Sequence, residues 1–461
     1  MTQHPKLDAS IFKAYDVRGI VDKTLTEDAV YWIGRALGAE AEARDEQQIY
    51  VARDGRLSGP KLIAALTRGL TEAGRDVIDL GMAPTPVLYY AAYELGSGSG
   101  IMITGSHNPP EYNGLKMVLG GTTLSGPDIQ QLRERIESGT LNEGSGSVDK
   151  AEVVQQYIER ITSDVKLAKP MKVIVDCGNG VAGGVAPQLL RELGCEVIEL
   201  FCDVDGNFPN HHPDPSKPEN LADLKQALAE QQADIGLAFD GDGDRLGVLT
   251  PTGNVIWADR QMMLYAQDVL SRNPGAEIIY DIKCTTNLHK IIEQAGGKAT
   301  MWKTGHSFVK AKLKETGAQL AGEMSGHIFF KERWYGFDDA TYTAARLLEI
   351  LAKDGRPADD IFNALPDSIN TPELNMSTEE GENHPLVNKL VAAADFPNAK
   401  ITTIDGLRVD FEDGFGLVRA SNTTPCLVFR FEATNEEALA RIQGDFRTLV
   451  TTQVPEAELP F

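Results

Sequence analysis

Residues 49–81 read IYVARDGRLSGPKLIAALTRGLTEAGRDVIDLG, and this stretch decides the fold. An apolar strand ends at Asp54, a loop of small residues follows, an amphipathic helix ends at Gly74, and a second apolar strand completes the unit. The pattern returns as KVIVD, PQLLRELG and CEVIELF between residues 172 and 201. It returns again as EIIYD, TTNLHKIIEQAG and KATMWKT between residues 277 and 304. The chain therefore contains three related units.

Each repeat has the order of a βαβ crossover, which produces parallel strands covered by helices. We therefore predict the α/β class, with three related α/β domains that have mixed, mainly parallel sheets. Ligands of such sheets gather at the carboxyl ends of the strands. The chain after the third repeat reads instead as three strands, GLRVDFED, GLVRAS and CLVFRFEA, followed by a helix from TNEEALARIQ. This predicts a smaller C-terminal α+β domain.

Three segments rich in glycine, serine or proline are candidate domain boundaries: NEGSGSVD at 142–149, PTGN at 251–254 and NALPDSINTPEL at 363–374. We predict domains at residues 1–150, 151–253, 254–366 and 367–461. At the start of the last helix we expect Thr434 to be the N-cap and Glu437 to complete a capping box.

The charge balance of the chain limits its partners. The 461 residues include 44 Lys and Arg against 67 Asp and Glu, a formal net charge of −23. A surface of that sign repels nucleic acids and anionic membranes, so we expect neither as a partner. The five cysteines form no C-x-x-C pair, and there is neither a signal-peptide pattern nor a long apolar run. These features favour a cytoplasmic protein with reduced thiols.

The first chemical motif is ITGSHNPPEYNGLK at residues 103–116, where an apolar strand runs into a loop fixed by two prolines. The hydroxyl of Ser106 is either a nucleophile and phosphoryl carrier or part of an Asx-type turn. The acyl-transfer pattern G-x-S-x-G would need glycines two residues either side of Ser106, where Thr104 and Asn108 stand. A hydrolase serine is therefore disfavoured.

The second motif is LAFDGDGDRLGVL at residues 237–249, with Asp240, Asp242 and Asp244 separated by single glycines. Carboxylates this close repel one another, which favours a divalent cation such as Mg²⁺. An EF-hand is excluded, because its sixth position would be Arg245 instead of glycine. The alternative is an acidic surface turn, although the flanking apolar strands favour a buried loop. Arg245 is placed to bind a phosphoryl oxygen.

Two further polar loops are candidates for ligand binding. GEMSGH at residues 322–327 offers Glu323, Ser325 and His327, a set that suits the hydroxyls of a sugar. RASNTTP at residues 419–425 supplies one guanidinium and several neutral donors, which suits a phosphate. Each string alone could equally be an ordinary solvated turn.

Together and in this order, the motifs TGSHNP, DGDGDR, GEMSGH and RASNTTP resemble those of the α-D-phosphohexomutase superfamily. The resemblance spans nearly the whole chain and is strongest to the bacterial phosphomannomutase/phosphoglucomutase branch. It implies three related α/β domains and a smaller C-terminal domain around a central active-site cleft. It also implies that Ser106 is the phosphorylated residue, and that one Mg²⁺ per chain is bound by Ser106, Asp240, Asp242 and Asp244.

The activity implied by the resemblance is the reversible interconversion of hexose 1-phosphates and hexose 6-phosphates of mannose and glucose. A hexose 1,6-bisphosphate would be the intermediate, with glucose 1,6-bisphosphate as activator. We expect catalytic roles for Ser106, His107, Lys116, Arg245 and His327, with Lys116 and His327 as candidates for the general base. The expected substrate-binding residues are Tyr15, Arg18, Lys283, His306, Glu323, Ser325, Arg419, Ser421, Asn422 and Thr423.

Three alternatives remain at this point. A phosphoglucosamine mutase would use the same chemistry, although that branch favours Gln at the position of Met324. A catalytically silent sugar-phosphate-binding protein would keep the fold without turnover. A phosphatase would release inorganic phosphate. We expect a monomer whose last domain closes on the substrate.

Overall fold

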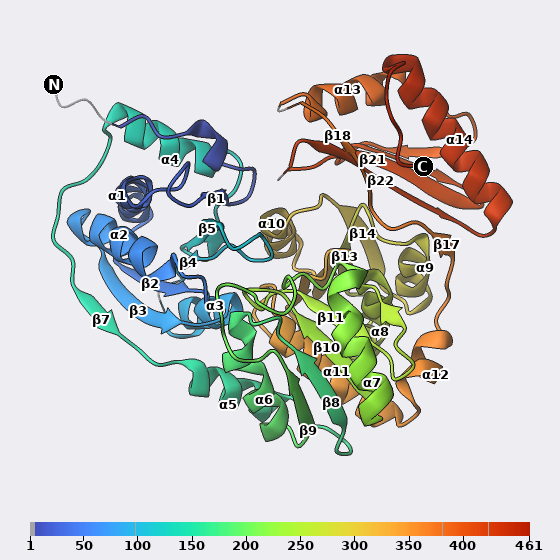
Figure 1. Ribbon diagram of the computed structural model, residues 1–461, viewed down its shortest axis with the longest axis horizontal. Helices are drawn as coiled ribbons and strands as arrows, with labels where there is room; N and C mark the ends of the chain where they lie inside the picture. Colours follow the sequence, from blue (N-terminus) through green and yellow to red (C-terminus); the bar gives the residue numbers. More distant parts are fainter. Residues whose placement is uncertain (1–4, 97, 380, 423) are drawn as a thin grey trace.

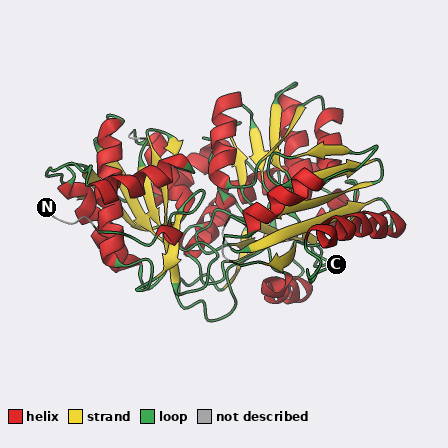
Figure 2. Ribbon diagram, turned by 90° about the horizontal axis from the view of Figure 1, so that it is seen from above, coloured by secondary structure: helices red, strands yellow, loops and turns green. Residues whose placement is uncertain are grey.

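The computed structural model describes residues 5–96, 98–379, 381–422 and 424–461. Within these residues the chain forms four sheets in sequence order, with the N-terminal sheet and the C-terminal sheet on opposite sides of the view in Figure 1. Helices lie on both sides of the strands in the part of the molecule nearest the N-terminus in Figure 2. The predicted fold class, three α/β units followed by a smaller α+β unit, is confirmed.

The first sheet has the order β1-β5-β4-β2-β3-β7, with β6 paired to β5. Its strands β2, β3, β4 and β7 are parallel, whereas β5 runs antiparallel to its neighbours. The strands are β1 (Val17–Ile20), β2 (Gln48–Arg53), β3 (Asp76–Met82), β4 (Gly100–Ile103), β5 (Tyr112–Leu119), β6 (Thr122–Thr123) and β7 (Val148–Lys150). The helices are α1 (Glu27–Ala43), α2 (Gly59–Glu72), α3 (Thr85–Glu94) and α4 (Pro127–Ser138).

The second sheet has the order β12-β11-β10-β8-β9. Its strands are β8 (Lys172–Asp176), β9 (Glu196–Leu200), β10 (Ile235–Phe239), β11 (Leu246–Leu249) and β12 (Val255–Ile256). Its helices are α5 (Val154–Asp164), α6 (Ala186–Glu192) and α7 (Ala222–Gln231). The PTGN segment at 251–254 is the turn that joins β11 to the antiparallel β12.

The third sheet has the order β14-β13-β15-β16. Its strands are β13 (Glu277–Asp281), β14 (Lys298–Trp302), β15 (Leu320–Gly322) and β16 (Ile328–Phe330). The accompanying helices are α8 (Ala258–Arg272), α9 (Thr286–Gln294), α10 (His306–Thr316), α11 (Ala340–Asp354) and α12 (Ala358–Asn363). The three predicted crossovers, β2-α2-β3, β8-α6-β9 and β13-α9-β14, all join parallel strands.

The last sheet is antiparallel, with the order β17-β22-β21-β20-β19 and β18 paired to β22. Its strands are β17 (Ile369–Asn370), β18 (Leu374–Ser377), β19 (Lys400–Thr402), β20 (Leu407–Phe411), β21 (Gly414–Ala420) and β22 (Cys426–Ala433). Its helices are α13 (Asn383–Ala393) and α14 (Glu436–Gln453). The prediction that Thr434 caps α14 is wrong. Asn435 is the N-cap, because its side chain accepts the Ala438 N–H at 2.9 Å.

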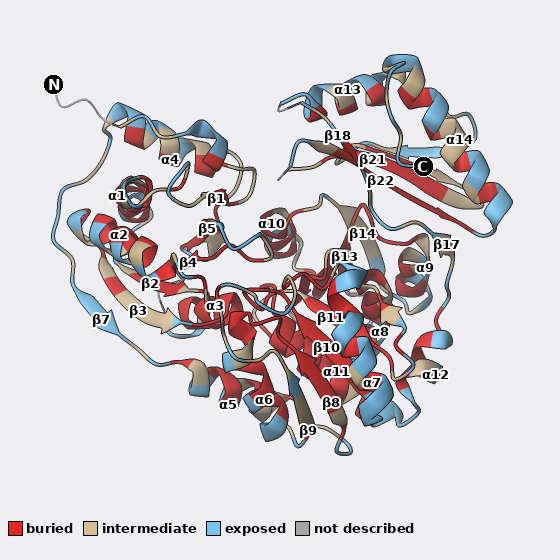
Figure 3. Cartoon of the chain, in the orientation of Figure 1, coloured by how far each residue is buried: buried red, intermediate tan, exposed pale blue. Residues whose placement is uncertain are grey.

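One large apolar core joins the first three units, and the last unit has a core of its own (Figure 3). In the shared core, Tyr90 of α3 packs against Tyr157 of α5, and Trp334 stacks on Tyr342 of α11 with ring centroids 4.3 Å apart. Such aromatic packing buries large areas and holds the three units together. The last unit contacts the third unit at the loop after β13, where Arg408 donates to the Ile282 and Cys284 carbonyls, and at Asp259, Thr286 and Thr304. None of the described helices is long and apolar enough to cross a membrane.

Candidate active site

The predicted motifs lie directly after strands of the four sheets. The Ser106 loop follows β4, the acidic loop follows β10, the Glu323 loop follows β15, and the Arg419 motif ends β21. The first two loops meet at the carboxyl ends of their sheets, where α/β folds bind ligands.

Ser106 is held in an unusual backbone conformation. Its φ is +48°, in the left-handed region that residues other than glycine seldom adopt, and its side chain is buried. The Ser106 N–H donates to Thr104 Oγ1 at 2.8 Å, and the Ser106 carbonyl accepts from Arg56 Nη2 at 2.8 Å. Its hydroxyl lies 3.2 Å from His107 Nδ1. The turn therefore fixes the direction of the Ser106 side chain.

Arg56 holds this loop together and was not predicted from the sequence. Its guanidinium is fully buried and donates to the carbonyls of Ser106, Asn108, Pro109 and Tyr112. Asp54 at the end of β2 pairs with Arg56 Nε at 3.2 Å and also accepts the Gly105 N–H at 3.0 Å. A Cβ added at Gly105 would lie 2.2 Å from the Arg56 guanidinium carbon, so glycine allows this close approach.

The three aspartates form one buried cluster against Ser106. Ser106 Oγ donates to Asp240 Oδ2 at 3.0 Å. Asp240 Oδ1 accepts the backbone N–H groups of Gly243, Asp244 and Arg245, each at 3.1 Å. Lys116 Nζ donates to Asp242 Oδ2 at 2.7 Å and also contacts Asp244 Oδ2.

The cluster has the donors that a divalent cation needs. Asp240, Asp242 and Asp244 each offer an oxygen within 4.8 Å of the others. The Oδ1 atoms of Asp242 and Asp244 are buried and have no hydrogen-bond partner among the described residues. Burial and the charges of Asp242 and Asp244 raise the pKa of Asp240 well above its usual value. Hard carboxylate oxygens with this excess of negative charge fit Mg²⁺.

Lys116 partly offsets this charge. Burial opposes the ammonium form of Lys116, but Asp242 and Asp244 outweigh that effect and raise its pKa. Burial likewise opposes the charged form of Asp242, but Lys116 outweighs it and lowers the pKa of that carboxyl. The Lys116 side chain therefore stays charged in this environment.

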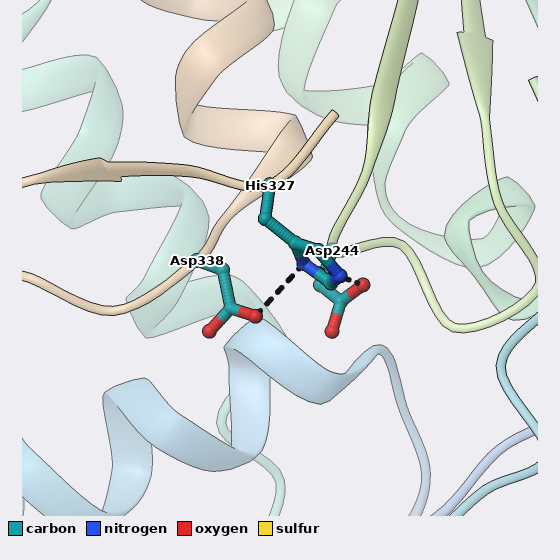
Figure 4. Close-up of side chains that lie close together, drawn as sticks. All are labelled: Asp244, His327 and Asp338. Atoms are coloured by element: carbon teal, nitrogen blue, oxygen red, sulfur yellow. Dashed lines mark ion pairs between the residues drawn. The ribbon is translucent and has the colours of Figure 1, made fainter. Parts of the chain in front are cut away.

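Figure 4 shows a second group, in which His327 lies between Asp244 and Asp338. His327 Nδ1 is 3.0 Å from Asp338 Oδ2 and 3.4 Å from Asp244 Oδ1. Arg245 Nε donates to His327 Nε2 at 2.9 Å, which places the ring proton on Nδ1, toward the carboxylates. The imidazole is therefore fixed in orientation and tautomer.

Asp338 was not predicted from sequence. It is fully buried and accepts from Lys310 Nζ at 2.9 Å. Burial alone would raise the pKa of Asp338, but Lys310 and His327 hold it well below its usual value. A signal was present in the pair Asp338–Asp339 before α11. Asp339 caps the helix by accepting the Tyr342 N–H, which leaves the first carboxylate for another role.

A cavity of about 490 Å³ lies against these groups. Eight of the predicted site residues line it: Tyr15, Arg18, Ser106, His107, Lys116, Arg245, His306 and His327. Burial, with the charges of Arg245 and Arg18, holds the pKa of His107 well below its usual value. Burial and nearby Lys310 do the same for the pKa of His306. Both ring nitrogens of His306 are buried and have no hydrogen-bond partner among the described residues, and Nδ1 lies 4.0 Å from Asp338 Oδ2.

The other predicted binding residues lie outside the described lining of this cavity. Glu323 is buried, and its Oε1 accepts the Gly305 N–H at 2.5 Å, one residue before His306. Ser325 is half-buried. Lys283 Nζ donates to Glu373 Oε1 at 2.6 Å. The side chains of Glu323 and Lys283 are therefore held by contacts within the third unit and its linker.

The Arg419 motif approaches the cavity from the last sheet. Arg419 Nε donates to Asp405 Oδ2 at 3.0 Å, and this carboxylate also accepts the Thr304 N–H at 3.0 Å. Ser421 and Asn422 lie in the loop between β21 and β22, whereas the predicted residue Thr423 lies outside the described residues. Thr424 and Pro425, which follow it, line the cavity. All four units thus contribute to one region.

The sequence matches four parts of one protein family. They are described as phosphoglucomutase/phosphomannomutase alpha/beta/alpha domain I at residues 9–143, domain II at 155–253, domain III at 257–369, and the C-terminal domain at 373–449. The resemblance predicted from the motifs is confirmed by these matches.

Individual relatives align over almost the whole chain. Phosphomannomutase/phosphoglucomutase of Pseudomonas putida is 58% identical, and the alignment covers 99% of this chain and 98% of that protein. Phosphoglucomutase of Neisseria gonorrhoeae is 57% identical, with 95% and 96% covered. The crystal structure of a phosphoglucomutase/phosphomannomutase family protein from Burkholderia thailandensis has a TM-score of 0.94 at 57% identity, with 99% and 100% covered. The chain therefore belongs to the phosphoglucomutase/phosphomannomutase family.

Proposed function

We propose that this chain is an isomerase that interconverts the 1-phosphates and 6-phosphates of mannose and glucose. One observation carries the proposal: the hydroxyl of Ser106, on a fixed turn, lies 3.0 Å from Asp240 of a buried cluster of three aspartates. A hydroxyl carrier beside a cation site is what phosphoryl transfer requires. The names of relatives at 57–58% identity agree with this activity.

In the first half-reaction, phospho-Ser106 gives its phosphoryl group to the free hydroxyl of a hexose 1-phosphate. The phosphorus–oxygen bond to Ser106 Oγ breaks as a new one forms to the sugar oxygen, and the hydroxyl proton leaves to a base. The product is a hexose 1,6-bisphosphate. The bisphosphate then reverses its orientation in the site. It transfers its other phosphoryl group to Ser106 and leaves as the hexose 6-phosphate. Glucose 1,6-bisphosphate would act as activator by phosphorylating Ser106.

The cation proposed for this site is Mg²⁺, held by Asp240, Asp242, Asp244 and Ser106. When bound, it would neutralise the charge that develops on the transferred phosphoryl group. Arg245 and Lys116 line the same cavity and add positive charge beside Ser106. Arg18, which pairs with Asp16 at 2.5 Å and donates to Asn108 Oδ1 at 3.1 Å, braces the same loop.

We retain both Lys116 and His327 as candidates for the group that accepts the hydroxyl proton. The ammonium of Lys116 is engaged by two carboxylates, and Nε2 of His327 accepts from Arg245 Nε at 2.9 Å, so each group would have to release a partner before it takes the proton. His107 is a neutral imidazole next to Ser106 and would orient its hydroxyl.

The substrate-binding residues have to bind the bisphosphate intermediate in both of its orientations. We assign the non-reacting phosphate to Arg419, Ser421, Asn422 and Thr423, with Lys283 nearby, and the sugar hydroxyls to Glu323 and Ser325. Tyr15 and His306 would complete the sugar site, since their rings pack edge to face with centroids 5.3 Å apart. A site that ignores the configuration at C2 would accept mannose and glucose alike.

We further propose four folding units close to the predicted ranges. The boundary between the second and third is placed after Ile256, because β12 pairs with β11 and belongs to the second sheet. We also propose that the protein is monomeric and cytoplasmic. Its partners would be hexose phosphates, and it would bind neither nucleic acid nor membrane.

The test is an assay with Mg²⁺ and a trace of glucose 1,6-bisphosphate, given mannose, glucose or glucosamine 1-phosphate separately. We expect the 6-phosphates of mannose and glucose, no net inorganic phosphate, and no product from Ser106→Ala. Turnover of glucosamine 1-phosphate alone would favour the phosphoglucosamine alternative. Release of inorganic phosphate would indicate a phosphatase, and absence of any product would leave a sugar-phosphate-binding protein.

A further inference from the structure

Two thiols of the second unit lie in contact. The Sγ atoms of Cys177 and Cys202 are 3.6 Å apart, and neither belongs to a disulfide. Cys177 directly follows β8 and Cys202 lies two residues beyond β9, the parallel neighbour of β8. The Cys177 N–H donates to the Leu200 carbonyl at 3.2 Å, so the pairing of the two strands continues up to the thiols.

This placement suits a disulfide. A disulfide needs sulfur atoms about 2.05 Å apart and Cα atoms about 5.5 Å apart. Neighbouring strands are about 4.8 Å apart, and Cys202 lies one position beyond the residue aligned with Cys177, which is compatible with the allowed Cα range of about 4.4–6.8 Å. Closing the remaining sulfur gap of about 1.5 Å needs side-chain rotation and a small loop shift.

We propose that Cys177 and Cys202 form a redox pair that hydrogen peroxide converts reversibly into a disulfide. Cys202 is half-buried, whereas Cys177 is completely buried, so Cys202 is the more accessible residue of the pair. The hydrogen bond shared with Cys202 and burial raise the pKa of Cys177 well above its usual value, which disfavours the Cys177 thiolate as the first nucleophile.

The chemistry balances with peroxide as the only oxidant. The Cys202 thiolate attacks one peroxide oxygen, the O–O bond breaks, and Cys202 becomes a sulfenic acid while hydroxide leaves. The Cys177 sulfur then attacks the Cys202 sulfur, the S–O bond breaks, and water leaves with the Cys177 proton. Two thiols lose two electrons in total and peroxide gains them. A dithiol reductant reverses the step by exchange.

The pair is coupled to the proposed cation site through the loop after Cys177. The Val181 N–H donates to the carbonyl of Gly241, between Asp240 and Asp242, at 3.1 Å. A Cβ added at Gly180 would lie 2.9 Å from Gly241 Cα, so the two loops are in close backbone contact. A shift of Cys177 toward Cys202 would therefore disturb the acidic loop. The disulfide form is expected to bind Mg²⁺ about fivefold or more weakly than the dithiol form.

The first measurement is the mass of the whole protein after treatment with hydrogen peroxide and removal of the excess. We expect a loss of about 2 Da, restored by dithiothreitol, with a linked peptide that contains Cys177 and Cys202. Stable addition of about 16 or 32 Da at Cys202, with Cys177 still open to alkylation after unfolding, would overturn the proposal. So would a disulfide between other cysteines.

The second measurement is Mg²⁺ affinity by calorimetry, before and after oxidation. Cys202→Ser should form no disulfide, and peroxide should leave its Mg²⁺ affinity unchanged. Cys195→Ser is the matched control, because it removes another thiol of the same unit and should respond to peroxide like the parent protein. A disulfide that leaves Mg²⁺ affinity of the parent unchanged would overturn the coupling to the acidic loop. Neither readout depends on the sugar specificity.

Discussion

Ser106 Oγ and Asp240 Oδ2 lie 3.0 Å apart, although the two residues are separated by 134 positions in the chain and come from different sheets. The first unit supplies the hydroxyl and the second supplies the carboxylates, so the site exists only when the two units are packed together. The shared aromatic core through Tyr90, Tyr157 and Trp334 maintains that packing.

Removing one carboxylate of the acidic cluster should weaken cation binding. Asp244→Asn keeps the shape of the side chain but removes a charge whose Oδ1 atom has no hydrogen-bond partner among the described residues. Loss of outer partners of a metal ligand costs about 10- to 100-fold in affinity, so loss of a ligand should cost at least about tenfold. Calorimetric titration with Mg²⁺ measures this. The exposed Asp223→Asn is the control, and equal affinity in both variants would contradict the assignment.

Arg56→Met should destabilise the protein strongly. The change leaves four carbonyl groups and the buried carboxylate of Asp54 without their partner. Breaking a buried charge pair costs about 3–5 kcal/mol in the free energy of unfolding. Urea unfolding gives the value. Arg68→Met removes an exposed guanidinium and should cost no more than about 1 kcal/mol. Similar losses in both variants would refute the bracing role of Arg56.

Asp339 should make stability depend on pH. Burial raises its pKa from 3.8 to about 7. A folded-state pKa above the unfolded value means that the protonated form stabilises the fold, and that this contribution is lost as pH rises through about 7. The difference amounts to about 4 kcal/mol at most. Between pH 4 and pH 8, the unfolding free energy of the parent should fall relative to that of Asp339→Asn. If the two free energies change with pH in parallel, the pKa of Asp339 is not raised in the folded protein.

The last unit should close on a bisphosphate ligand. It has its own core and is attached to the third unit through the loop after β13, where Arg408 donates to the carbonyls of Ile282 and Cys284 at 2.6 and 2.8 Å. A separately folded unit that carries phosphate-binding side chains favours rigid-body closure. Glucose 1,6-bisphosphate should reduce both the scattering radius and cleavage by trypsin. Arg419→Gln should lessen both effects, and a ligand that changes neither quantity would contradict closure.

The sequence was sufficient for the fold because the three repeats have a strong period. The segments after Gln48, Lys172 and Glu277 form the predicted strands, and their crossovers are parallel as expected. The Ser106 and Asp240 motifs were also readable, because each combines a reactive residue type with glycines at a strand end. Their contact with each other is consistent with the rule that ligands bind at strand ends.

Residues that act through distant partners could not be found in this way. Arg56 reaches carbonyls about fifty positions away, and Asp338 depends on Lys310 and His327. Nothing in the sequence around Arg56 distinguishes it from a solvated charge, and the pair Asp338–Asp339 before α11 does not identify the partners of Asp338. The prediction of the N-cap of α14 was wrong for another reason. Thr434 and Asn435 are both good N-cap residues, and only the path of the backbone selects Asn435.

The most direct test of the account is the mass of the whole protein during one cycle of transfer. After incubation with glucose 1,6-bisphosphate and Mg²⁺, we expect an added mass of about 80 Da that maps to Ser106 and disappears when excess mannose 1-phosphate is supplied. Ser106→Ala should neither gain this mass nor turn over. Steady turnover of hexose 1-phosphate by a protein that never carries phosphate on Ser106 would contradict the central claim.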